Sequence, residues 1–402
     1  MKRFFRFMAA FAWAILMLSC SRKAQTHDIV MAFDHPAEIW EECIPLGNGH
    51  IGLMPDGGIF HESITLNDIT LWSGAPYDDS NPKALASLPE IRRLLQEGRN
   101  FEAQQLMYES FVCGGQGSGQ GKGANVPFGC YQMLGTLDVD FGIEGESVNE
   151  SYRRSLNLNT ATSEVKYSVG GHRYSRTTFL SRKDDVAVIK MFSDTAFSLQ
   201  IHLSRPECAS VTNFENGAIL QGQLRSNVEG VEGMRYYAKV IAVPSKNQTE
   251  WILYFAAATD YMCENPERYV NKRIDNALKF SYKELYKRHL QSYRDYYDRV
   301  ELDINGALTH HSDEMTLKEH WRKFLEEDDA WLPVCYFQYG RYLLISSTRE
   351  DLLPPNLQGL WANTIQTPWN GDYHLNINVE MNHWPCEVCN LSELHLQLIR
   401  FT

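Results

Sequence analysis

The stretch VKYSVGGHRY, residues 165–174, shows the pattern that decides the fold of the N-terminal part of the chain. Apolar residues alternate with polar ones up to a Gly-Gly pair, with the period of a strand that buries one face. These apolar residues are Val165, Tyr167 and Val169. Glycine tolerates the positive φ angles of a two-residue hairpin turn, and a second apolar run starts near Tyr174. The stretch therefore predicts a β-hairpin.

Similar apolar-rich runs follow one another at close spacing on the C-terminal side of this hairpin. They cover residues 186–192, 197–203, 234–243 and 251–258. Many short strands in succession are typical of an all-β domain built from two packed sheets. We therefore expect an N-terminal β-sandwich domain over residues 28–270.

One helical segment interrupts the strand-like pattern. The segment ALASLPEIRRLLQEGRNFEAQQLMYESF, residues 84–111, carries Leu88, Ile91, Leu94 and Leu95 at helical spacing. This pattern predicts an amphipathic helix, or a pair of helices, on the edge of the sandwich.

The stretch CGGQGSGQGKGAN, residues 113–125, is rich in glycine. It lacks the preceding strand, the following helix and the Gly-Lys-Ser/Thr ending that a phosphate-binding loop requires. We expect a mobile surface loop here.

The hydrophobic period becomes helical from about residue 275. Aromatic residues at spacings of three and four predict a helical linker over residues 271–310. The stretch AWLPVCYFQYGRYLLISS, residues 330–347, is apolar nearly all round, as in a helix buried between neighbours. Residues 311–402 therefore read as the start of an all-α domain.

The composition excludes some classes of ligand. The chain of 402 residues has 44% hydrophobic residues and a net charge of −12, so it is a folded, acidic protein. Nucleic-acid binding requires clustered lysines and arginines, and no such cluster is evident, so we expect no nucleic-acid partner.

The N-terminus MKRFFRFMAAFAWAILMLSC has the layout of an export signal, with basic residues before the apolar run Phe7–Leu18. Leu18-Ser19-Cys20 resembles a bacterial lipobox, in which Cys20 becomes the lipidated first residue of the mature chain. We expect an exported protein, in the periplasm or at the outer membrane, whose only membrane attachment is the lipid on Cys20. Plain secretion is the alternative.

The other cysteines indicate neither a disulfide framework nor a metal site. They are scattered, and their pairing cannot be read from the sequence. Cys386 and Cys389 form a C-x-x-C without a second pair or a histidine set, which favours a packing role. We expect no metal and no cofactor.

Several separate stretches together carry a family resemblance. They are PAEIWEECIPLGNGHIG (36–52), ITLNDITLWSG (64–74), YQMLGTLDVDF (131–141), HLQSYRDYYDRV (289–300) and LPPNLQGLWANTIQTPWNGDYHLNINVEMNHWPCEVCNLSEL (353–394). In this order they resemble glycoside hydrolase family 95, the inverting α-L-fucosidases. The resemblance implies an N-terminal β-sandwich (super-sandwich), a helical linker and an (α/α)6 catalytic barrel. It also implies hydrolysis of terminal α-1,2-linked L-fucose in an oligosaccharide or glycan.

The resemblance also assigns roles within the last of these stretches. Inverting hydrolysis needs an acid for the leaving oxygen and a base that activates water, and this family uses an asparagine at the base position. By motif, Asn378 is the water-activating residue and Asn376 helps to hold the water. If the segment is locally extended, residues two apart point to one side, so both amides reach the same water.

The same stretch supplies candidates for contact with the sugar. By the same alternation His374 faces the same pocket, and the resemblance places it near the C5 substituent, where histidine goes with fucose rather than L-galactose. Aromatic rings stack on the C–H faces of sugars, which makes Trp361, Trp369 and Trp384 candidate walls of the pocket. Taken singly, each tryptophan is more often a core residue, and each asparagine is more often a cap or turn residue.

Neither nearby glutamate fits the general acid. Glu380 lies at the start of an expected helix, where a carboxylate is favourable, and Glu387 reads as a buried, hydrogen-bonded scaffold residue. In the family the acid is a glutamate, and an aspartate polarises the asparagine, both far beyond Thr402. We therefore expect an incomplete barrel, with an unpartnered apolar face on residues 330–345, and an inactive or poorly soluble chain.

Three alternatives stay open at this point. Two of them are a non-catalytic glycan-binding or decayed fragment and an α-L-galactosidase of the same family. A sandwich followed by a helical barrel is also the plan of the α-glucan and disaccharide phosphorylases, which the HLNIN motif at residues 374–378 disfavours.

Overall fold

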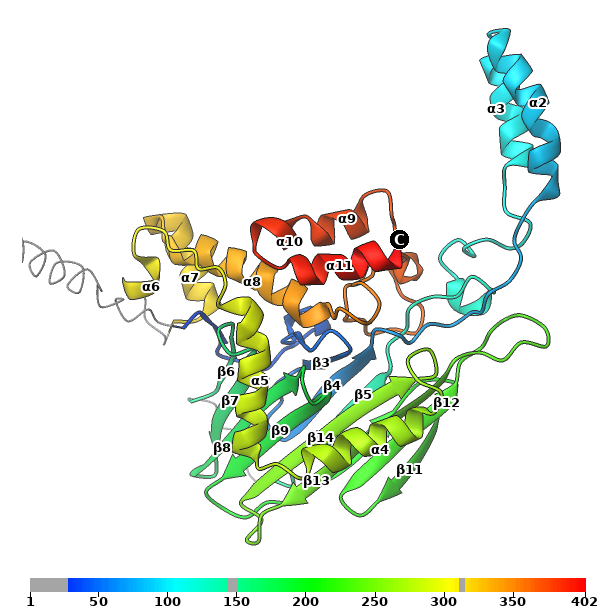
Figure 1. Ribbon diagram of the computed structural model, residues 1–402. Coiled ribbons are helices and arrows are strands. Elements are labelled where there is room, and N and C mark those ends of the chain that lie inside the picture. The colour runs from blue at the N-terminus through cyan, green and yellow to red at the C-terminus, as the bar shows by residue number, and fades with distance from the viewer. Residues whose placement is uncertain (1–27, 144–150, 311–314) are drawn as a thin grey trace, which may run out of the picture.

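The computed structural model describes residues 28–143, 151–310 and 315–402. The export segment and Cys20 lie outside these residues. Two antiparallel sheets form the lower part of the molecule in Figure 1. The larger sheet has nine strands, in the spatial order β1 (Val30–Phe33), β6 (Arg153–Asn157), β7 (Thr162–Val169), β8 (His172–Ser181), β9 (Val186–Ser193), β14 (Glu250–Thr259), β13 (Arg235–Pro244), β12 (Gly217–Gln223) and β11 (Ser210–Phe214). The smaller sheet has β10 (Gln200–Ser204), β5 (Gly135–Asp140), β4 (His61–Asp68), β3 (Ile51–Pro55) and β2 (Leu46–Gly47).

The predicted hairpin is present. Strands β7 and β8 pair up to Val169 and His172, and Gly170 and Gly171 between them have φ angles of 57° and 82°. Two consecutive positive φ angles match the twist of the flanking strands, which is why two glycines close this hairpin.

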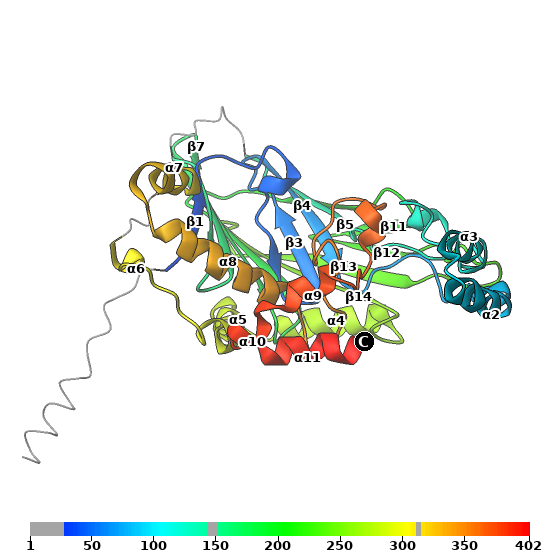
Figure 2. The same ribbon diagram turned by 90° about the horizontal axis from the view of Figure 1, so that it is seen from above.

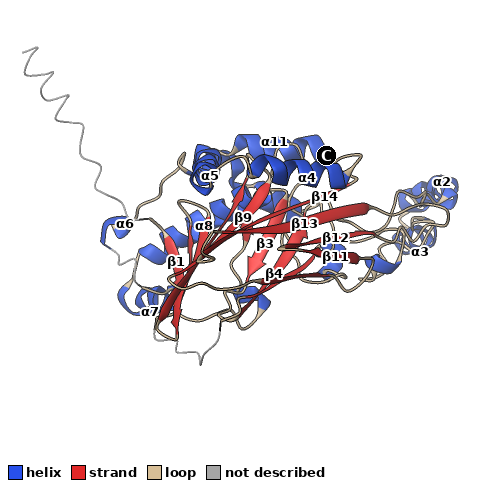
Figure 3. Cartoon of the chain, turned by 90° about the horizontal axis from the view of Figure 1, so that it is seen from below, coloured by secondary structure: helices blue, strands red, loops and turns tan. Residues whose placement is uncertain are grey.

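Strands β9 and β14 are buried on both faces. Ala187, Ile189 and Met191 of β9 point into the core between the two sheets. Val186 and Val188 of the same strand belong to a second apolar cluster on the outer face. Helices α4 (Pro266–Ala277) and α5 (Tyr282–Tyr297) cover this outer face, so the run of residues 186–191 is apolar except for Lys190 (Figure 3).

Both covering helices begin at well-capped positions. The Asn265 side chain accepts a hydrogen bond from the Arg268 N–H, and Ser281 and Glu284 form a capping box at the start of α5. These caps satisfy N–H groups that have no partner within the helix. Val270 and Ile274 of α4 are then held against Tyr237 and neighbouring strand residues.

The helical C-terminal part lies as a layer above the sandwich in Figure 1. It comprises α6 (Ala307–His310), α7 (Leu317–Glu327), α8 (Trp331–Ser347), α9 (Asn378–His383), α10 (Pro385–Val388) and α11 (Ser392–Phe401), and the 3-10 turn η3 (Pro368–Gly371) precedes α9. Two further 3-10 turns, η1 (Trp40–Glu42) and η2 (Gly123–Asn125), lie in loops of the sandwich. The predicted fold class, a β-sandwich followed by a helical connector and the helices of an incomplete barrel, is confirmed.

The expectation for the apolar helix is wrong in its details. Most of the apolar residues of α8 are buried, because α5, α7 and the sandwich pack around it, while Tyr336 remains exposed. A further group of exposed apolar side chains lies on α9 to α11 and in the turn before them. They are Leu375, Ile377, Met381, Trp384, Val388, Leu396, Ile399 and Phe401.

The helix pair also differs from the prediction. Helices α2 (Pro82–Gln96) and α3 (Asn100–Ser110) form a hairpin that projects away from the body of the molecule instead of lying on the sandwich edge (Figures 1 and 2). Its small core consists of Ile91, Leu94 and Ala103 with Leu106 against them. The apolar faces of the two helices pack against each other. The amphipathic pattern therefore does not show where the pair lies relative to the sandwich.

The search for membrane-spanning helices, which covered the described residues, found none that is long and apolar enough to span a bilayer.

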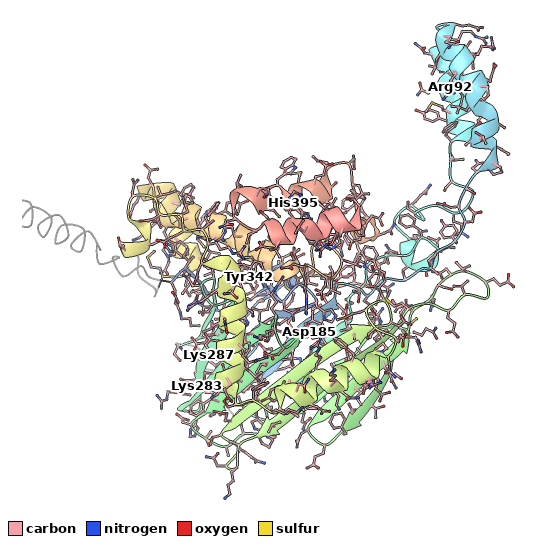
Figure 4. All side chains as sticks on the ribbon, viewed as in Figure 1. Arg92, Asp185, Lys283, Lys287, Tyr342 and His395 are labelled. Atoms are coloured by element: carbon pink, nitrogen blue, oxygen red, sulfur yellow. The ribbon has the colours of Figure 1, made fainter. Side chains whose placement is uncertain are left out.

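The sandwich and the helical layer interlock at Trp361. The Trp361 indole is 8% exposed, and its N–H donates a hydrogen bond of 2.9 Å to the Leu46 carbonyl. It fits there because Gly47 and Gly52 lack side chains: a Cβ on Gly52 would lie 2.9 Å from Leu360 and 3.1 Å from the indole. The Tyr342 hydroxyl, which lies on the sandwich side of α8 (Figure 4), donates to the Pro45 carbonyl at 2.6 Å.

A buried charge network crosses the same junction. The His50 imidazole lies between two carboxylates, with Nδ1 at 2.9 Å from Asp185 Oδ2 and Nε2 at 3.2 Å from Asp68 Oδ2. Arg349, just after α8, donates to Asp185 Oδ1 at 2.8 Å, and Tyr269 of α4 donates to Asp185 Oδ2 at 2.8 Å. Figure 4 shows Asp185 at the centre of the molecule, between the sheets and the helices.

This geometry sets the charge states. Burial by itself lowers the pKa of His50, but the carboxylates of Asp185 and Asp68 outweigh burial and raise that pKa to about 10. Burial likewise opposes ionisation of Asp185, yet His50 and Arg349 hold the pKa of its carboxyl well below the usual range. His50 is therefore an imidazolium at neutral pH.

The Trp361→Ala variant should lower the free energy of unfolding by about 3–5 kcal/mol, because it empties the space between the sandwich and the helices. Urea unfolding monitored by circular dichroism measures this loss. Trp321→Ala is the matched control, since Trp321 on α7 is 56% exposed, and it should change stability by no more than about 0.5 kcal/mol. Equal losses of unfolding free energy in the two variants would contradict the role of Trp361 in joining the sandwich to the helices.

The stability of the wild-type protein should fall as the pH rises above about 6.5. The pKa of His50 is raised in the folded state, so its contribution is fully present below the unfolded pKa and is lost as the pH rises towards the folded pKa of about 10. The slope attributable to this proton is up to about 1.4 kcal/mol per pH unit. Urea unfolding over a range of about pH 6.5 to 8.5 measures it.

His50→Gln should remove this slope, and His289→Gln should keep it. The control is matched because His289 is also buried, but burial lowers its folded pKa to about 4. Its contribution to stability therefore rises with pH towards the unfolded pKa of about 6.5 and is constant above about pH 7.5, so it cannot cause a fall in stability at higher pH. The same slope in His50→Gln as in the wild type would show that His50 is not the group that titrates.

Candidate active-site segment

The segment 353–378 connects α8 to α9 and runs along the edge of the sandwich. Asn67 at the end of β4 holds it in two directions: its amide donates to the Ala362 carbonyl at 2.8 Å and accepts from the Ala362 N–H at 3.2 Å. The buried Tyr131 hydroxyl donates to the Leu360 carbonyl at 2.6 Å. The Met133 N–H donates to the Thr364 carbonyl. The sandwich therefore sets the path of this segment.

The turn Trp369–Gly371 within this segment has an unusual backbone. Trp369, Asn370 and Gly371 have φ angles of 47°, 60° and 65°, all in the left-handed region. For a bulky residue such as tryptophan this conformation is rare and costs on the order of 1–3 kcal/mol. Such strain persists only where the surrounding structure over-determines it.

Asn370 supplies that surrounding structure. Its side chain is buried and bonds to three partners: Oδ1 accepts from the Gly123 N–H and from Gln366 Nε2, and Nδ2 donates to the Ser118 carbonyl, each at 2.9 Å. The Asn370 carbonyl also accepts from the Tyr131 N–H. The turn is thus fixed mainly by residues that lie far away in the sequence.

These contacts correct the prediction for the Gly-rich stretch. Its end is held in place, because the Gly123 and Ala124 N–H groups donate to Asn370 and Gln366, and both residues are buried. In Figures 1 and 2 the turn η2 lies beside the segment that contains η3. A Cβ on Gly123 would lie 2.2 Å from the Gly129 carbonyl, so only glycine fits there. Gly123 is therefore needed because the backbone passes close to the Gly129 carbonyl, not because the loop must be flexible.

The two candidate amides lie in a turn. Residues 375–377 form the turn, and Asn378 is the first residue of α9, so the expected extended alternation is wrong at this point. Asn376 is exposed and Asn378 is half-buried. Helix α9 has no side-chain cap, and within the described part of the chain neither amide makes a hydrogen bond. The helix-cap alternative is therefore not what the structure has.

His374 lies beside a carboxylate that the sequence analysis missed. The distance between His374 Nε2 and Asp372 Oδ2 is 4.0 Å, and both side chains are partly buried. Burial raises the pKa of Asp372, against the opposing effect of His374. Tyr373 between them stacks on Trp72 of the sandwich at 5.3 Å between ring centroids and donates to the Pro354 carbonyl.

The three candidate tryptophans have different environments. Trp361 is a buried junction residue, whereas Trp369 is 72% exposed and Trp384 is 61% exposed. The core alternative therefore describes Trp361. The two exposed indoles keep the possibility of stacking on a sugar.

The neighbouring carboxylates and cysteines have scaffold positions. Glu387 is exposed rather than buried as expected, but it does accept hydrogen bonds from Ser392 at 2.6 Å and from His395 at 2.9 Å. Cys386 and Cys389 are buried in the main core, in agreement with the packing role. Within residues 28–143, 151–310 and 315–402, no group of three or more metal-ligating side chains is placed to hold an ion.

Two cavities lie near the segment. A groove of about 540 Å3 between α8, α9 and residues 355–361 is lined by Tyr339, Leu343, Trp361 and Met381 among others. A second, of about 670 Å3, is lined mainly by charged residues, including Arg182, Arg349 and Arg400. His374, Asn376 and Asn378 line neither of these two cavities; Asn376 is exposed, and His374 and Asn378 are half-buried.

Sequence reasoning missed the residues that position the segment. Asn370 and Asn67 have no local signal that separates them from ordinary loop asparagines, because their partners lie 247 and 295 residues away. The glycine at position 123 carried a signal, but its neighbours suggested flexibility.

Two family models match the chain. The glycosyl hydrolase family 65 N-terminal domain matches residues 31–264, and the glycosyl hydrolase family 95 catalytic domain matches residues 281–402. Both models are domains of glycosyl hydrolases. The helical part of the chain, residues 281–402, belongs by this match to the catalytic domains of glycoside hydrolase family 95.

Relatives in plants and fungi are similar over most of the chain. "Alpha-L-fucosidase 2" of Arabidopsis thaliana is 32% identical over 411 residues, covering 90% of this chain and 47% of that protein. "Probable alpha-fucosidase A" of Aspergillus niger is 31% identical over 397 residues, covering 88% and 47%. The chain thus spans about half the length of the curated relatives it matches. A solved structure, "Putative kojibiose phosphorylase from human microbiome", aligns with a TM-score of 0.46 and 11% identity over 83% of this chain and 42% of that one.

Asn370→Ala should release the Gly-rich stretch, because it removes the acceptor for Gly123 and the donor to Ser118. Limited proteolysis followed by mass spectrometry should show new cleavage within residues 113–125. Asn305→Ala is the matched control, since Asn305 is an exposed asparagine that also has a left-handed φ, of 54°. If Asn370→Ala and Asn305→Ala are cleaved alike, the hydrogen bonds of Asn370 to Gly123 and Ser118 are not what orders this stretch.

Proposed function

We propose that this chain carries the sandwich and the water-binding part of the catalytic domain of an α-L-fucosidase that hydrolyses terminal α-1,2-linked L-fucose with inversion. The family assignment and the two fucosidase relatives support the substrate class. The observation that carries the mechanism is the pair of amides, Asn376 and Asn378, which is not used by any hydrogen bond among the described residues.

In this proposal the two amides hold a water molecule at the face of the sugar opposite the leaving oxygen. An amide oxygen is a poor base, so it needs a carboxylate that polarises it, and protonation of the leaving oxygen needs an acid. The family resemblance puts both carboxylates beyond residue 402. His374, held next to Asp372, would contact the C5 substituent of fucose.

The same environment weighs against the alternatives. His374 favours fucose over L-galactose at the C5 position by the family resemblance. A phosphorylase would need a phosphate site, and the stretch around Asn376 carries no basic side chain other than histidine between Arg349 and Arg400. A non-catalytic glycan-binding fragment could use the same amides, because they match sugar hydroxyls as donors and acceptors, and the assay below separates it from the enzyme.

We further propose that the protein is exported and that Cys20 carries a lipid. The basic residues, the apolar run and the Leu-Ser-Cys ending support this proposal. Metabolic labelling with a fatty acid tests it, with Cys20→Ala as the unlabelled control.

Release of fucose from 2′-fucosyllactose tests the proposed activity. The purified 402-residue chain is compared with the longest form encoded by its gene, and proton NMR follows the anomer that appears first. Inversion predicts β-L-fucose as the first product. Activity in the longer form alone would support a role for carboxylates outside this chain, and no release in either form would refute the proposal.

Asn378→Ala, in the active form, should lower kcat by about 100-fold or more with little change in KM, because the amide acts on the water in the transition state. Asn363→Ala is the matched control: Asn363 is an exposed asparagine of the same segment. Glu387→Gln should also keep its activity, since Glu387 bonds to Ser392 and His395. A normal kcat in Asn378→Ala would reject its role.

A further inference from the structure

The left-handed turn Trp369–Gly371 displays an aromatic ring that the fold itself does not use. The Trp369 indole is 72% exposed, and in the described part of the chain it makes neither a ring contact nor a hydrogen bond. The turn thus holds its largest side chain in a strained backbone conformation without burying it. A strained residue whose side chain the fold leaves exposed points to a function of that side chain.

Other exposed tryptophans show that this arrangement is unusual. Trp321 and Trp384 are 56% and 61% exposed, but Trp321 lies within α7 and Trp384 has ordinary helical φ and ψ angles. Their positions follow from their helices. The position of Trp369 follows from the bonds of Asn370 to Gly123, Ser118 and Gln366.

The hydrogen bonds of Asn370 to Gly123, Ser118 and Gln366, here called the clamp, also set the surroundings of the indole. The clamp brings the Gly-rich stretch next to the turn, because the Gly123 and Ala124 N–H groups donate to Asn370 and Gln366. A flat, exposed aromatic ring suits a sugar, which has an apolar C–H face and a rim of hydroxyls.

We propose that Trp369 is the stacking platform for the sugar on the leaving-group side of the scissile bond, and that Asn370 is the positioning residue that aims it. This inference rests on the proposed function and extends it to the rest of the glycan. In the proposed function residues 374–378 contact the terminal fucose, which leaves the exposed indole of Trp369, outside that stretch, for the next sugar of the glycan. Trp369 would therefore determine which glycans are accepted, not how the bond is broken.

Binding of lactose, the part of 2′-fucosyllactose that remains after fucose is removed, tests the platform without any need for turnover. Saturation-transfer NMR and titration measure lactose and free L-fucose separately. The wild-type chain should bind lactose, and Trp369→Ala should weaken that binding about fivefold or more. Binding of L-fucose should be unchanged, and Trp369→Phe should restore most of the lactose affinity.

Two further variants separate positioning from general damage. Asn370→Ala should weaken lactose binding as Trp369→Ala does, because the indole is no longer held in place. The double variant should bind lactose no more weakly than Trp369→Ala alone. Trp321→Ala should bind lactose as the wild type does. Circular dichroism and thermal unfolding check that each variant is folded.

The outcomes distinguish this inference from the proposed function. Loss of lactose binding in Trp369→Ala with no fucose release by any form of the wild type would keep the platform and reject the fucosidase. Fucose release with equal lactose binding in the wild type and Trp369→Ala would keep the fucosidase and overturn the platform. No lactose binding by the wild type would also overturn it.

Discussion

The structure depends on the buried ion cluster around Asp185, where the sandwich meets the helices. Asp185 accepts from His50, Arg349 and Tyr269, and His50 also contacts Asp68. Charges removed from water are costly unless each is paired, so removal of one member leaves the others unpaired. Because Arg349 comes from the helical part, the cluster is complete only when the two parts are docked. The sandwich and the first catalytic helices are therefore one folding unit.

This dependence explains why the candidate site is built from both parts. The chain leaves α8 and passes Arg349 before the segment 353–378 begins. Within this segment Trp361 fits against Gly47 and Gly52, and Asn67 and Tyr131 hold the backbone. Several of the stretches that carry the family resemblance meet here. Some of their residues therefore serve docking rather than chemistry, as Trp361 does, and the sandwich acts as the template on which the site segment is laid.

The sequence alone predicted those features whose cause is local. The Gly170-Gly171 turn, the strand in the apolar run of residues 186–192 and the packing role of Cys386 and Cys389 all follow from side-chain type and spacing. The errors occur where partners are distant. Gly123 looked like part of a mobile loop, Glu387 looked buried, and residues 375–377 looked extended, because nothing near them in the chain specifies their neighbours.

The sequence by itself determined the class of fold and the stretch in which to look for chemistry, because hydrophobic period and turn residues act over short distances. Only the tertiary structure decided which residues of that stretch are free to act. Trp361 is consumed by packing, Asn370 by the clamp, and Asn376 and Asn378 are left unpaired. Whether a polar or aromatic side chain is used up by the fold depends on contacts with residues hundreds of positions away, and no local pattern encodes those contacts.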